Sequence, residues 1–277
     1  MICAITGSSG VLGSYIIKNN TDVKFLRYLG DITNKNEIKS WILKKKFDYF
    51  LHLAAIVPTS EIKNNYLYAK KVNYYGTKNI VDALLLKRNV YFFFASSSHV
   101  YSSSIKKIKE TSSTKSISLY GKLKCLSEKY IIKKFKNSVN NYCIGRIFSF
   151  TNKNQKKNFL IPSIYQKILM SKNKKIIFHN TNHNRDFISI NDINNSIFYL
   201  LKNNSKGIYN IASGKKINLQ YLIKIICKKF NKIPKFVANK NSTTLIADIS
   251  KIKKIGWSPK DDILKILKDY ELSKNFK

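Results

Sequence analysis

The chain has 277 residues, and its 51 Lys and Arg against 15 Asp and Glu give a formal net charge of +36 at pH 7. A hydrophobic fraction of 44% and an aromatic fraction of 13% exclude wholesale disorder. No apolar run approaches the ~18 residues that a membrane-spanning helix needs. The chain begins with an apolar strand and a glycine loop rather than a signal peptide, so we expect a cytoplasmic protein with no membrane partner.

The basic residues are almost all Lys, and the Arg residues are only Arg27, Arg88, Arg146 and Arg185. Arg normally leads the recognition of bases and phosphates because its planar guanidinium donates in pairs. Its scarcity argues against a specific nucleic-acid partner, and the Lys residues spread along the whole chain predict a solvated surface. The positive field would still attract a diphosphate ligand.

The cysteines stand far apart, at Cys3, Cys125, Cys143 and Cys227. They form no CxxC pair and no Cys/His cluster at the spacing of metal ligands. The pattern predicts reduced thiols in a reducing compartment and no metal site.

Short apolar runs alternate with amphipathic stretches over the first half of the chain. We predict strands over 1–6, 23–29, 49–57, 90–95 and 142–148, and helices over 11–17, 34–46, 66–86 and 119–135. Strands that alternate with helices in this way indicate βαβ units around a parallel sheet. The sequence therefore predicts an α/β protein whose first domain spans residues 1–150.

The pattern changes after residue 150. Residues 151–158 are polar and predict a loop, followed by helices over 161–170, 193–201 and 219–230 and by strands over 176–178 and 207–212. We predict a smaller C-terminal lobe made of residues 151–184 and 212–277. The chain is expected to return to the first domain at about 185–211.

The first predicted strand runs into a glycine loop in which Gly7, Gly10 and Gly13 form a GxxGxxG pattern. Glycine allows the sharp turn, lets the backbone approach a pyrophosphate and lets the helix pack closely on the sheet. The N–H groups at the helix start, around Val11 and Leu12, would face the phosphate oxygens. Between a first strand and a first helix, the pattern predicts a Rossmann-type dinucleotide site rather than a bare structural turn.

Eight further motifs follow in order, and with the loop they resemble the NAD-dependent epimerase/dehydratase family, the extended short-chain dehydrogenase/reductases. The resemblance covers residues 5–259. The motifs are Gly30-Asp31-Ile32-Thr33, the HLAA of residues 52–55, the VNYYGT of residues 72–77, the SSSHVY of residues 96–101, the YxxxK of Tyr120 and Lys124, the RDF of residues 185–187 and the YNIASG of residues 209–214. The GWSP of residues 256–259 closes the series.

The resemblance implies a doubly wound Rossmann-type sheet that binds NAD or NADP, with a substrate-binding role for the smaller lobe. Besides the glycine loop, the implied cofactor contacts are Asp31, Ile32, Leu53, Ala54, Ala55, Asn73, Phe148, Tyr120 and Lys124. It also implies a nucleotide-diphosphate sugar as substrate, in a polysaccharide pathway, and a homodimer through the helices over 66–86 and 119–135. The second helix carries Lys122, Lys124, Lys129, Lys133, Lys134 and Lys136, which would weaken such an interface by repulsion.

Tyr120 and Lys124 stand one helical turn apart, as the YxxxK motif requires. The resemblance implies that Tyr120 exchanges a proton with a sugar hydroxyl during hydride transfer, and that Lys124 holds the nicotinamide ribose. We expect the Lys124 charge to favour the phenolate and so to lower the pKa of Tyr120 from about 10. The motif recurs at Tyr130 and Lys134, but its distance from the serine strand end favours Tyr120.

Ser97 matches the hydroxyl that positions the reacting oxygen, with Ser98 as the next candidate. Dehydratases of the family carry an Asp-Glu pair after this serine, whereas Ser98 and His99 stand here. That departure disfavours 4,6-dehydration. For His99 a proton relay and a structural role both stay open.

Two further positions bear on substrate binding. Arg185 matches the Arg that pairs with the substrate diphosphate in sugar-nucleotide members, and a salt bridge to Asp186 is the alternative. Ser149 stands where the family usually places an Asn that bonds the substrate.

An acid at the end of the second strand usually binds the ribose 2′-OH of NAD. This chain has Arg27 there and no acid. Arg27 is therefore a candidate contact for the 2′-phosphate of NADP, or a plain surface base. The short segment between Gly13 and Asp31 resembles the nucleotide-sugar 4-ketoreductases, whereas the VNYYGT and serine motifs resemble UDP-glucose 4-epimerase-like members.

We therefore expect an NAD(P)-dependent enzyme that transfers hydride at C4 of a nucleotide-diphosphate sugar, as a 4-epimerase or a 4-ketoreductase. The alternative is a non-catalytic, NAD(P)-sensing or RNA-associated protein of the same fold. Such proteins typically lack the Tyr or the Lys, so the presence of Ser97, Tyr120 and Lys124 favours an enzyme.

Overall fold

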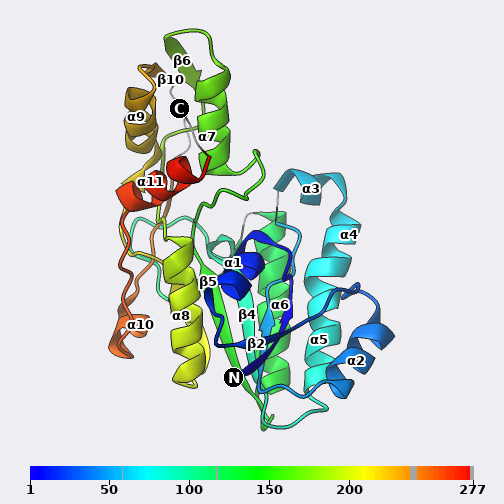
Figure 1. Cartoon of the computed structure of the whole chain (residues 1–277). Helices are drawn as coiled ribbons and strands as arrows, with labels where there is room; N and C mark the ends of the chain where they lie inside the picture. The colour runs from blue at the N-terminus through cyan, green and yellow to red at the C-terminus, as the bar shows by residue number, and fades with distance from the viewer. Residues whose placement is uncertain (58, 117, 238–241, 275–277) are drawn as a thin grey trace.

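The computed structural model describes residues 1–57, 59–116, 118–237 and 242–274, and within them six parallel strands form the main sheet (Figure 1). Their spatial order is β2-β1-β3-β4-β5-β8. The strands are β1 (Ile2–Thr6), β2 (Lys24–Arg27), β3 (Tyr49–His52), β4 (Tyr91–Ser97), β5 (Asn141–Ile147) and β8 (Gly207–Ile211). The chain moves to one side of β1 and then to the other, so a crevice opens at the carboxyl ends of β1 and β3.

Helices cover both faces of this sheet, as a doubly wound fold requires (Figure 1). One face carries α1 (Val11–Asn19) and α8 (Ile190–Lys202), and the other carries α2 (Lys35–Lys44), α5 (Thr77–Leu84) and α6 (Leu119–Phe135). Successive residues of β4 point to opposite faces, so Phe93 joins the core under α8 while Phe92 and Phe94 join the core under α5. Every residue of β4 is buried, which explains its unbroken apolar run.

Two predictions between β3 and β4 are wrong in detail. The strand predicted over 49–57 ends at His52, because the Asn73 side chain binds the backbone of Ile56 through both its oxygen and its nitrogen, each at 2.8 Å. The helix predicted over 66–86 is interrupted by a π-helical turn, η1 (Lys71–Gly76), between α4 (Tyr66–Lys70) and α5. In that turn the Asn73 carbonyl accepts hydrogen bonds from Thr77 and Ser127, both at 2.9 Å. A short helix, α3 (Thr59–Asn64), precedes α4.

A separate core lies in a smaller lobe, drawn above the sheet in Figure 1. Its elements are α7 (Leu160–Met170), β6 (Lys175–Phe178), α9 (Leu219–Lys229), β10 (Ile233–Phe236) and α11 (Ile263–Lys274). A small sheet of β11 (Thr243–Leu245), β7 (His183–Arg185) and β9 (Ile217–Asn218) joins this region. The short helix α10 (Ser250–Lys254) follows β11, and the turn η2 (Ser98–Val100) follows β4 of the main sheet. Residues 190–211 return to the main sheet as α8 and β8, whereas 183–185 belong to the small sheet. The predicted domain bounds stay a prediction.

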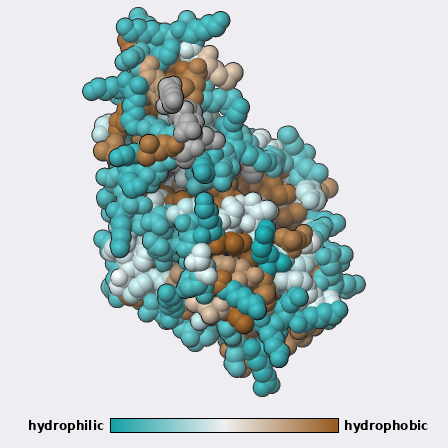
Figure 2. Space-filling view, in the orientation of Figure 1, coloured by the Kyte–Doolittle hydropathy of each residue, from teal (hydrophilic) through white to brown (hydrophobic). Residues whose placement is uncertain are grey.

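The surface seen in Figure 2 is largely hydrophilic, as the Lys-rich composition predicts. Within the described part of the chain, no helix has both the length and the apolar character needed to cross a membrane. The homodimer stays a prediction. Lys124 does not add to the lysine repulsion expected at such an interface, because it is only 2% exposed and faces the protein interior.

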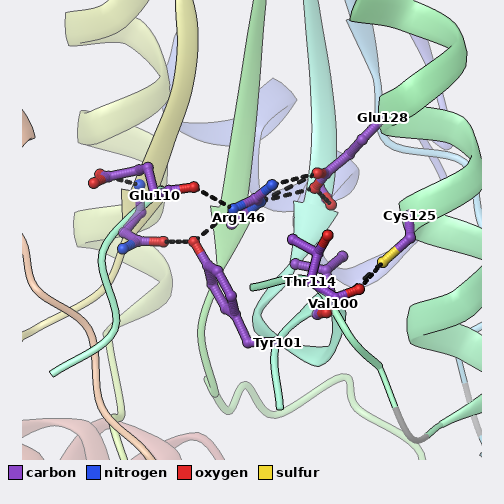
Figure 3. A network of polar contacts seen from close by, with 9 residues as sticks. Val100, Tyr101, Glu110, Thr114, Cys125, Glu128 and Arg146 are labelled. Atoms are coloured by element: carbon purple, nitrogen blue, oxygen red, sulfur yellow. Dashed lines mark hydrogen bonds and ion pairs between the residues drawn. The ribbon is translucent and has the colours of Figure 1, made fainter. Parts of the chain in front are cut away.

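A buried ion pair joins β5 to α6 (Figure 3). Arg146 Nη2 lies 2.6 Å from Glu128 Oε2, and Arg146 Nε donates to Glu128 Oε1 at 3.0 Å. Arg146 Nη1 also donates to the Tyr101 hydroxyl at 2.8 Å and to the Glu110 carbonyl at 2.9 Å. Tyr101 in turn donates to Asn210 of β8 at 2.7 Å. These contacts fasten α6 to two neighbouring strands.

We predict that Arg146→Met lowers the free energy of unfolding by about 3–5 kcal/mol, because it leaves the Glu128 carboxylate buried without its partner. Chemical denaturation monitored by circular dichroism measures this change. Arg88→Met is the matched control, since Arg88 is exposed and its loss should change stability by less than about 0.5 kcal/mol. Equal stability of the two variants would show that the buried pair does not hold the fold.

Candidate active site

A cavity of about 720 Å³ opens at the carboxyl ends of β1, β3, β4 and β5. Residues of five predicted motifs line it, together with the start of α7: the glycine loop, the HLAA at the end of β3, the serine strand end, the YxxxK helix and the RDF of residues 185–187. These motifs are far apart in the sequence. The first four meet because parallel strands place all their carboxyl ends at one edge of the sheet.

The glycine loop is shaped to receive a phosphate group. Gly7 has φ +74°, and a Cβ built on it would lie 2.5 Å from the Ala54 nitrogen. A Cβ on Gly13 would lie 2.2 Å from the Gly7 carbonyl oxygen. Helix α1 begins at Val11, and its N-cap Gly10 has no side chain to bind the first N–H groups. These groups and the helix dipole therefore fit a diphosphate, as the pyrophosphate of NAD or NADP would supply.

The other predicted cofactor residues divide into two groups. Val11, Leu12, Leu53, Ala55 and Phe148 line the cavity beside the three loop glycines. Arg27, Asp31, Ile32, Ala54 and Asn73 are not among the residues that line it.

Local contacts explain what three of this second group do. The Asp31 carboxylate accepts hydrogen bonds from the Thr33 amide and hydroxyl, and the Asn73 side chain is engaged by the Ile56 backbone. Arg27 is exposed at the end of β2, paired in register with Ile5 of β1. Asn73 thus holds the chain that follows β3.

Ser97, Tyr120 and Lys124 come together on the cavity wall. Ser97 ends β4, while Tyr120 and Lys124 lie one turn apart near the start of α6. Ser97 and Tyr120 share a side-chain hydrogen bond, and the His99 ring packs edge-on to Tyr120 with centroids 5.8 Å apart. The helix begins here because the Ser118 hydroxyl accepts a hydrogen bond from the Gly121 amide at 3.0 Å.

Ser96 and Ser98 line the cavity beside Ser97, but their contacts differ. Ser96 donates to the buried Glu128, and Ser98 begins the turn η2. Tyr130 donates to Asp82 on α5 and is absent from the cavity wall. Of the two YxxxK matches, only Tyr120 with Lys124 therefore lines the cavity.

Burial controls the protonation of this group. It lowers the pKa of Lys124 to about 7, against an opposing effect of the Glu128 charge. The Lys124 ammonium donates to the Ala95 carbonyl at 2.7 Å. Burial also raises the pKa of Tyr120, although the hydrogen bond with Ser97 opposes this. The expected lowering of the Tyr120 pKa is therefore wrong for the chain alone. The cost of burying the phenolate outweighs the stabilisation that the hydrogen bond with Ser97 gives it.

Arg185 lies on the same wall, and the alternative of a salt bridge to Asp186 is not seen among the ion pairs of the described residues. Its guanidinium donates to the carbonyls of Asn184 and Thr243 and to the Thr243 hydroxyl, at 2.9–3.0 Å. Asp186 instead accepts from the Ser213 and Gly214 amides. Burial lowers the pKa of Arg185, and no carboxylate of the described chain pairs with it. The side chain thus presents an uncompensated positive charge to the cavity.

Sequence reasoning missed one side of the site. The segment over 151–158, predicted as a plain loop, contributes Gln155 and Asn158 to the cavity wall, and Phe159 follows directly after it on the same wall. Its Lys156 forms an ion pair with Glu61 of α3. The position of this segment in the sequence could have indicated its place in the site. It follows the carboxyl end of β5 and comes directly after Phe148 and Ser149, which also line the cavity.

Titratable groups elsewhere offer no competing centre. The four cysteines are free thiols, and Cys3, Cys143 and Cys227 are buried. Within the described chain, no cluster of His, Cys, Asp and Glu has the geometry of a metal site.

A family model described as GDP-mannose 4,6 dehydratase matches residues 16–270. The chain belongs to this family. The match confirms the assignment to the extended short-chain dehydrogenase/reductases, which are nucleotide-sugar epimerase- and dehydratase-type oxidoreductases.

Individual relatives agree with this assignment. The chain is 28% identical over 269 residues to GDP-6-deoxy-D-talose 4-dehydrogenase from Aggregatibacter actinomycetemcomitans, covering 90% of this chain and 88% of the relative. Its structure is similar to RMD from Pseudomonas aeruginosa complexed with NADPH, with a TM-score of 0.89, 18% identity and 98% of each chain covered. It is also similar to UDP-glucose 4-epimerase with UDP-glucose from Thermotoga maritima, with a TM-score of 0.86, 19% identity and 99% of each chain covered. The Rossmann-type fold is thereby confirmed.

The lowered pKa of Lys124 predicts a pH-dependent stability. Between about pH 7 and the ordinary lysine pKa of 10.5, the unfolded chain keeps a proton that the folded protein has lost. The free energy of unfolding should therefore rise with pH over this range, by up to about 1.4 kcal/mol per pH unit relative to Lys124→Met, and stay level below it. Denaturant unfolding of both proteins from about pH 6 to 9.5 measures the difference. A difference that does not change with pH would mean that Lys124 keeps its ordinary pKa.

Proposed function

We propose that the protein is an NAD(P)-dependent enzyme that transfers hydride at C4 of a nucleotide-diphosphate sugar, as a 4-epimerase or a 4-ketoreductase. One observation carries the proposal: Ser97, Tyr120 and Lys124 lie on the same cavity as the glycine loop. A proton-transferring group and a dinucleotide cradle in one cavity suit the removal of a hydride and a proton from an alcohol, or the reverse.

Each of the three side chains has a role in this proposal. Tyr120 takes the proton of the C4 hydroxyl as the hydride leaves C4, and returns it to the oxygen in the reverse direction. Ser97, hydrogen-bonded to Tyr120, holds the reacting oxygen. Lys124 binds the nicotinamide ribose and brings a positive charge near Tyr120. NAD(P), when bound, supplies the hydride acceptor or donor.

The unpaired charge of Arg185 supports a diphosphate substrate, because a guanidinium binds phosphate oxygens in bidentate fashion. Two of the named relatives act on, or are bound to, GDP- and UDP-linked sugars. We therefore propose a nucleotide-diphosphate sugar as substrate, with Arg185 on its diphosphate and Ser149 near its sugar.

The cavity wall also bears on which reaction is catalysed. Elimination of water in a dehydratase needs an acid and a base besides Tyr120. Ser98 and His99 stand where the carboxylates would be, and among the described residues no Asp or Glu lines the cavity. The composition of the wall therefore favours simple hydride transfer over 4,6-dehydration, although the matching family model carries a dehydratase name.

Release of the bound nucleotide from the denatured, purified protein separates the two reactions. Stoichiometric NAD(H), identified by mass spectrometry, is expected of a 4-epimerase, because the hydride must leave and return on one retained cofactor. An empty protein that prefers added NADPH is expected of a 4-ketoreductase, with the exposed Arg27 on the 2′-phosphate. A protein that neither contains nor binds NAD(P) would refute the enzyme and favour the RNA-associated alternative.

With cofactor and substrate in hand, Tyr120→Phe should lower kcat by about 10²–10⁴-fold, since it removes the proton-transferring hydroxyl. Tyr130→Phe is the matched control, because Tyr130 has the same motif but lies away from the cavity. Steady-state turnover of nucleotide sugars compares the two variants with the wild type. A Tyr120→Phe enzyme that keeps full kcat would exclude this tyrosine as the acid/base.

A further inference from the structure

Two buried polar atoms in the loop between β5 and α7 lack any partner. Among the described side chains, Thr151 Oγ1 and Gln155 Oε1 are the buried oxygen or nitrogen atoms without a hydrogen bond. Leaving such an atom unsatisfied costs about 1–3 kcal/mol, so buried polar groups nearly always have a partner. Both atoms lie in one segment of five residues, which points to a ligand rather than to scattered local defects.

Gln155 is the one of the two that lines the cavity. Its side chain is only 7% exposed, and its Nε2 donates to the Phe150 carbonyl at 3.2 Å. That bond fixes the orientation of the amide, because only the nitrogen can donate to a carbonyl. Oε1 is therefore an acceptor without a donor.

The loop holds Gln155 in place from both sides. The Gln155 amide donates to the Asn152 carbonyl at 3.0 Å, which closes a tight turn. On the C-terminal side of Gln155, Lys156 forms an ion pair with Glu61, and Asn158 Nδ2 approaches Ser60 Oγ at 3.5 Å. The acceptor is thus positioned before a ligand arrives, which is how a specificity-determining group is held.

Three neighbouring side chains of the cavity wall are apolar, so a donor for Gln155 Oε1 has to come from the ligand. Phe150, Phe159 and Leu160, which line the cavity from the same stretch of chain, have apolar side chains. Gln155 lines the cavity beside them, and an amide oxygen that binds a ligand favours one with an O–H or N–H at that point over one without it.

We propose that Gln155 is a specificity-determining residue, whose Oε1 accepts a hydrogen bond from a hydroxyl or N–H group of the nucleotide sugar. The inference rests on the proposed function, which supplies the class of ligand. The donor belongs to the sugar or to the base of that ligand. Gln155 does not touch the reacting atoms in this proposal, so it acts on substrate affinity and choice.

The test compares Gln155→Met with the wild type by isothermal titration calorimetry, in the presence of saturating NAD(H) or NADPH. The probes are UDP-glucose, GDP-mannose, dTDP-glucose and CDP-glucose, each beside its nucleoside diphosphate. Met keeps the length of the side chain but lacks the acceptor. We expect about tenfold weaker binding of the preferred nucleotide sugar, with cofactor affinity unchanged.

Controls separate recognition from loop damage. Gln166→Met is the matched control, because Gln166 lies half-buried on α7 outside the cavity, and should bind like the wild type. Gln155→Asn keeps the amide but shortens the side chain by one methylene, and should give an intermediate loss even if the Met variant is unstable.

Each outcome has a distinct meaning. Loss for the nucleotide sugar alone places the donor on the sugar, and equal loss for the nucleoside diphosphate places it on the nucleotide; both support the proposal. Unchanged binding of nucleotide sugars by both Gln155 variants overturns it while the proposed function stands. A parallel loss of cofactor affinity also overturns it, since Gln155 then only supports the loop. Absence of binding by the wild type refutes the proposed function itself.

Discussion

The buried contact between Arg146 and Glu128 holds together the parts that any chemistry here requires. Glu128 lies one turn beyond Lys124 on α6, and the same carboxylate accepts a hydrogen bond from Ser96, the neighbour of Ser97 at the end of β4. A single side chain therefore fixes the helix that carries Tyr120 against the strand that carries its serine partner. Ion pairs of this kind cost desolvation free energy when they form, but removing one partner is far more costly.

The same burial gives the site its electrostatic character. Lys124, deprived of water, holds its proton weakly, and Tyr120 holds its proton tightly. With Arg185 uncompensated and no described carboxylate on the wall, the cavity lacks the negative charges that its cations would pair with. Phosphate groups would provide them. A phosphate group bound near Lys124 would favour its charged ammonium form.

Both lobes contribute to this cavity, and they do so unequally. The main sheet supplies the glycine loop and the reactive side chains, all at strand ends that the parallel topology brings to one edge. The loop after β5 and the start of α7 supply the opposite wall, with Gln155 and Phe159. A scaffold of buried strands can place chemistry reproducibly, while a connecting loop is free to vary and select substrates.

Local patterns in the sequence were enough to predict the glycine loop, the YxxxK pair and the alternation of strands and helices, because each depends on residues close together in the chain. They also sufficed to place Ser97, Tyr120 and Lys124 in one family arrangement, which their meeting in the cavity matches. The chain after β3 and the π-helical turn after α4 meet at Asn73, whose partners Ile56 and Ser127 are distant in sequence. Likewise, only tertiary packing decided that Lys124 is desolvated, that Arg146 pairs with Glu128 and that Gln155 reaches the cavity, since burial and pairing of polar groups arise from segments that the linear sequence keeps apart.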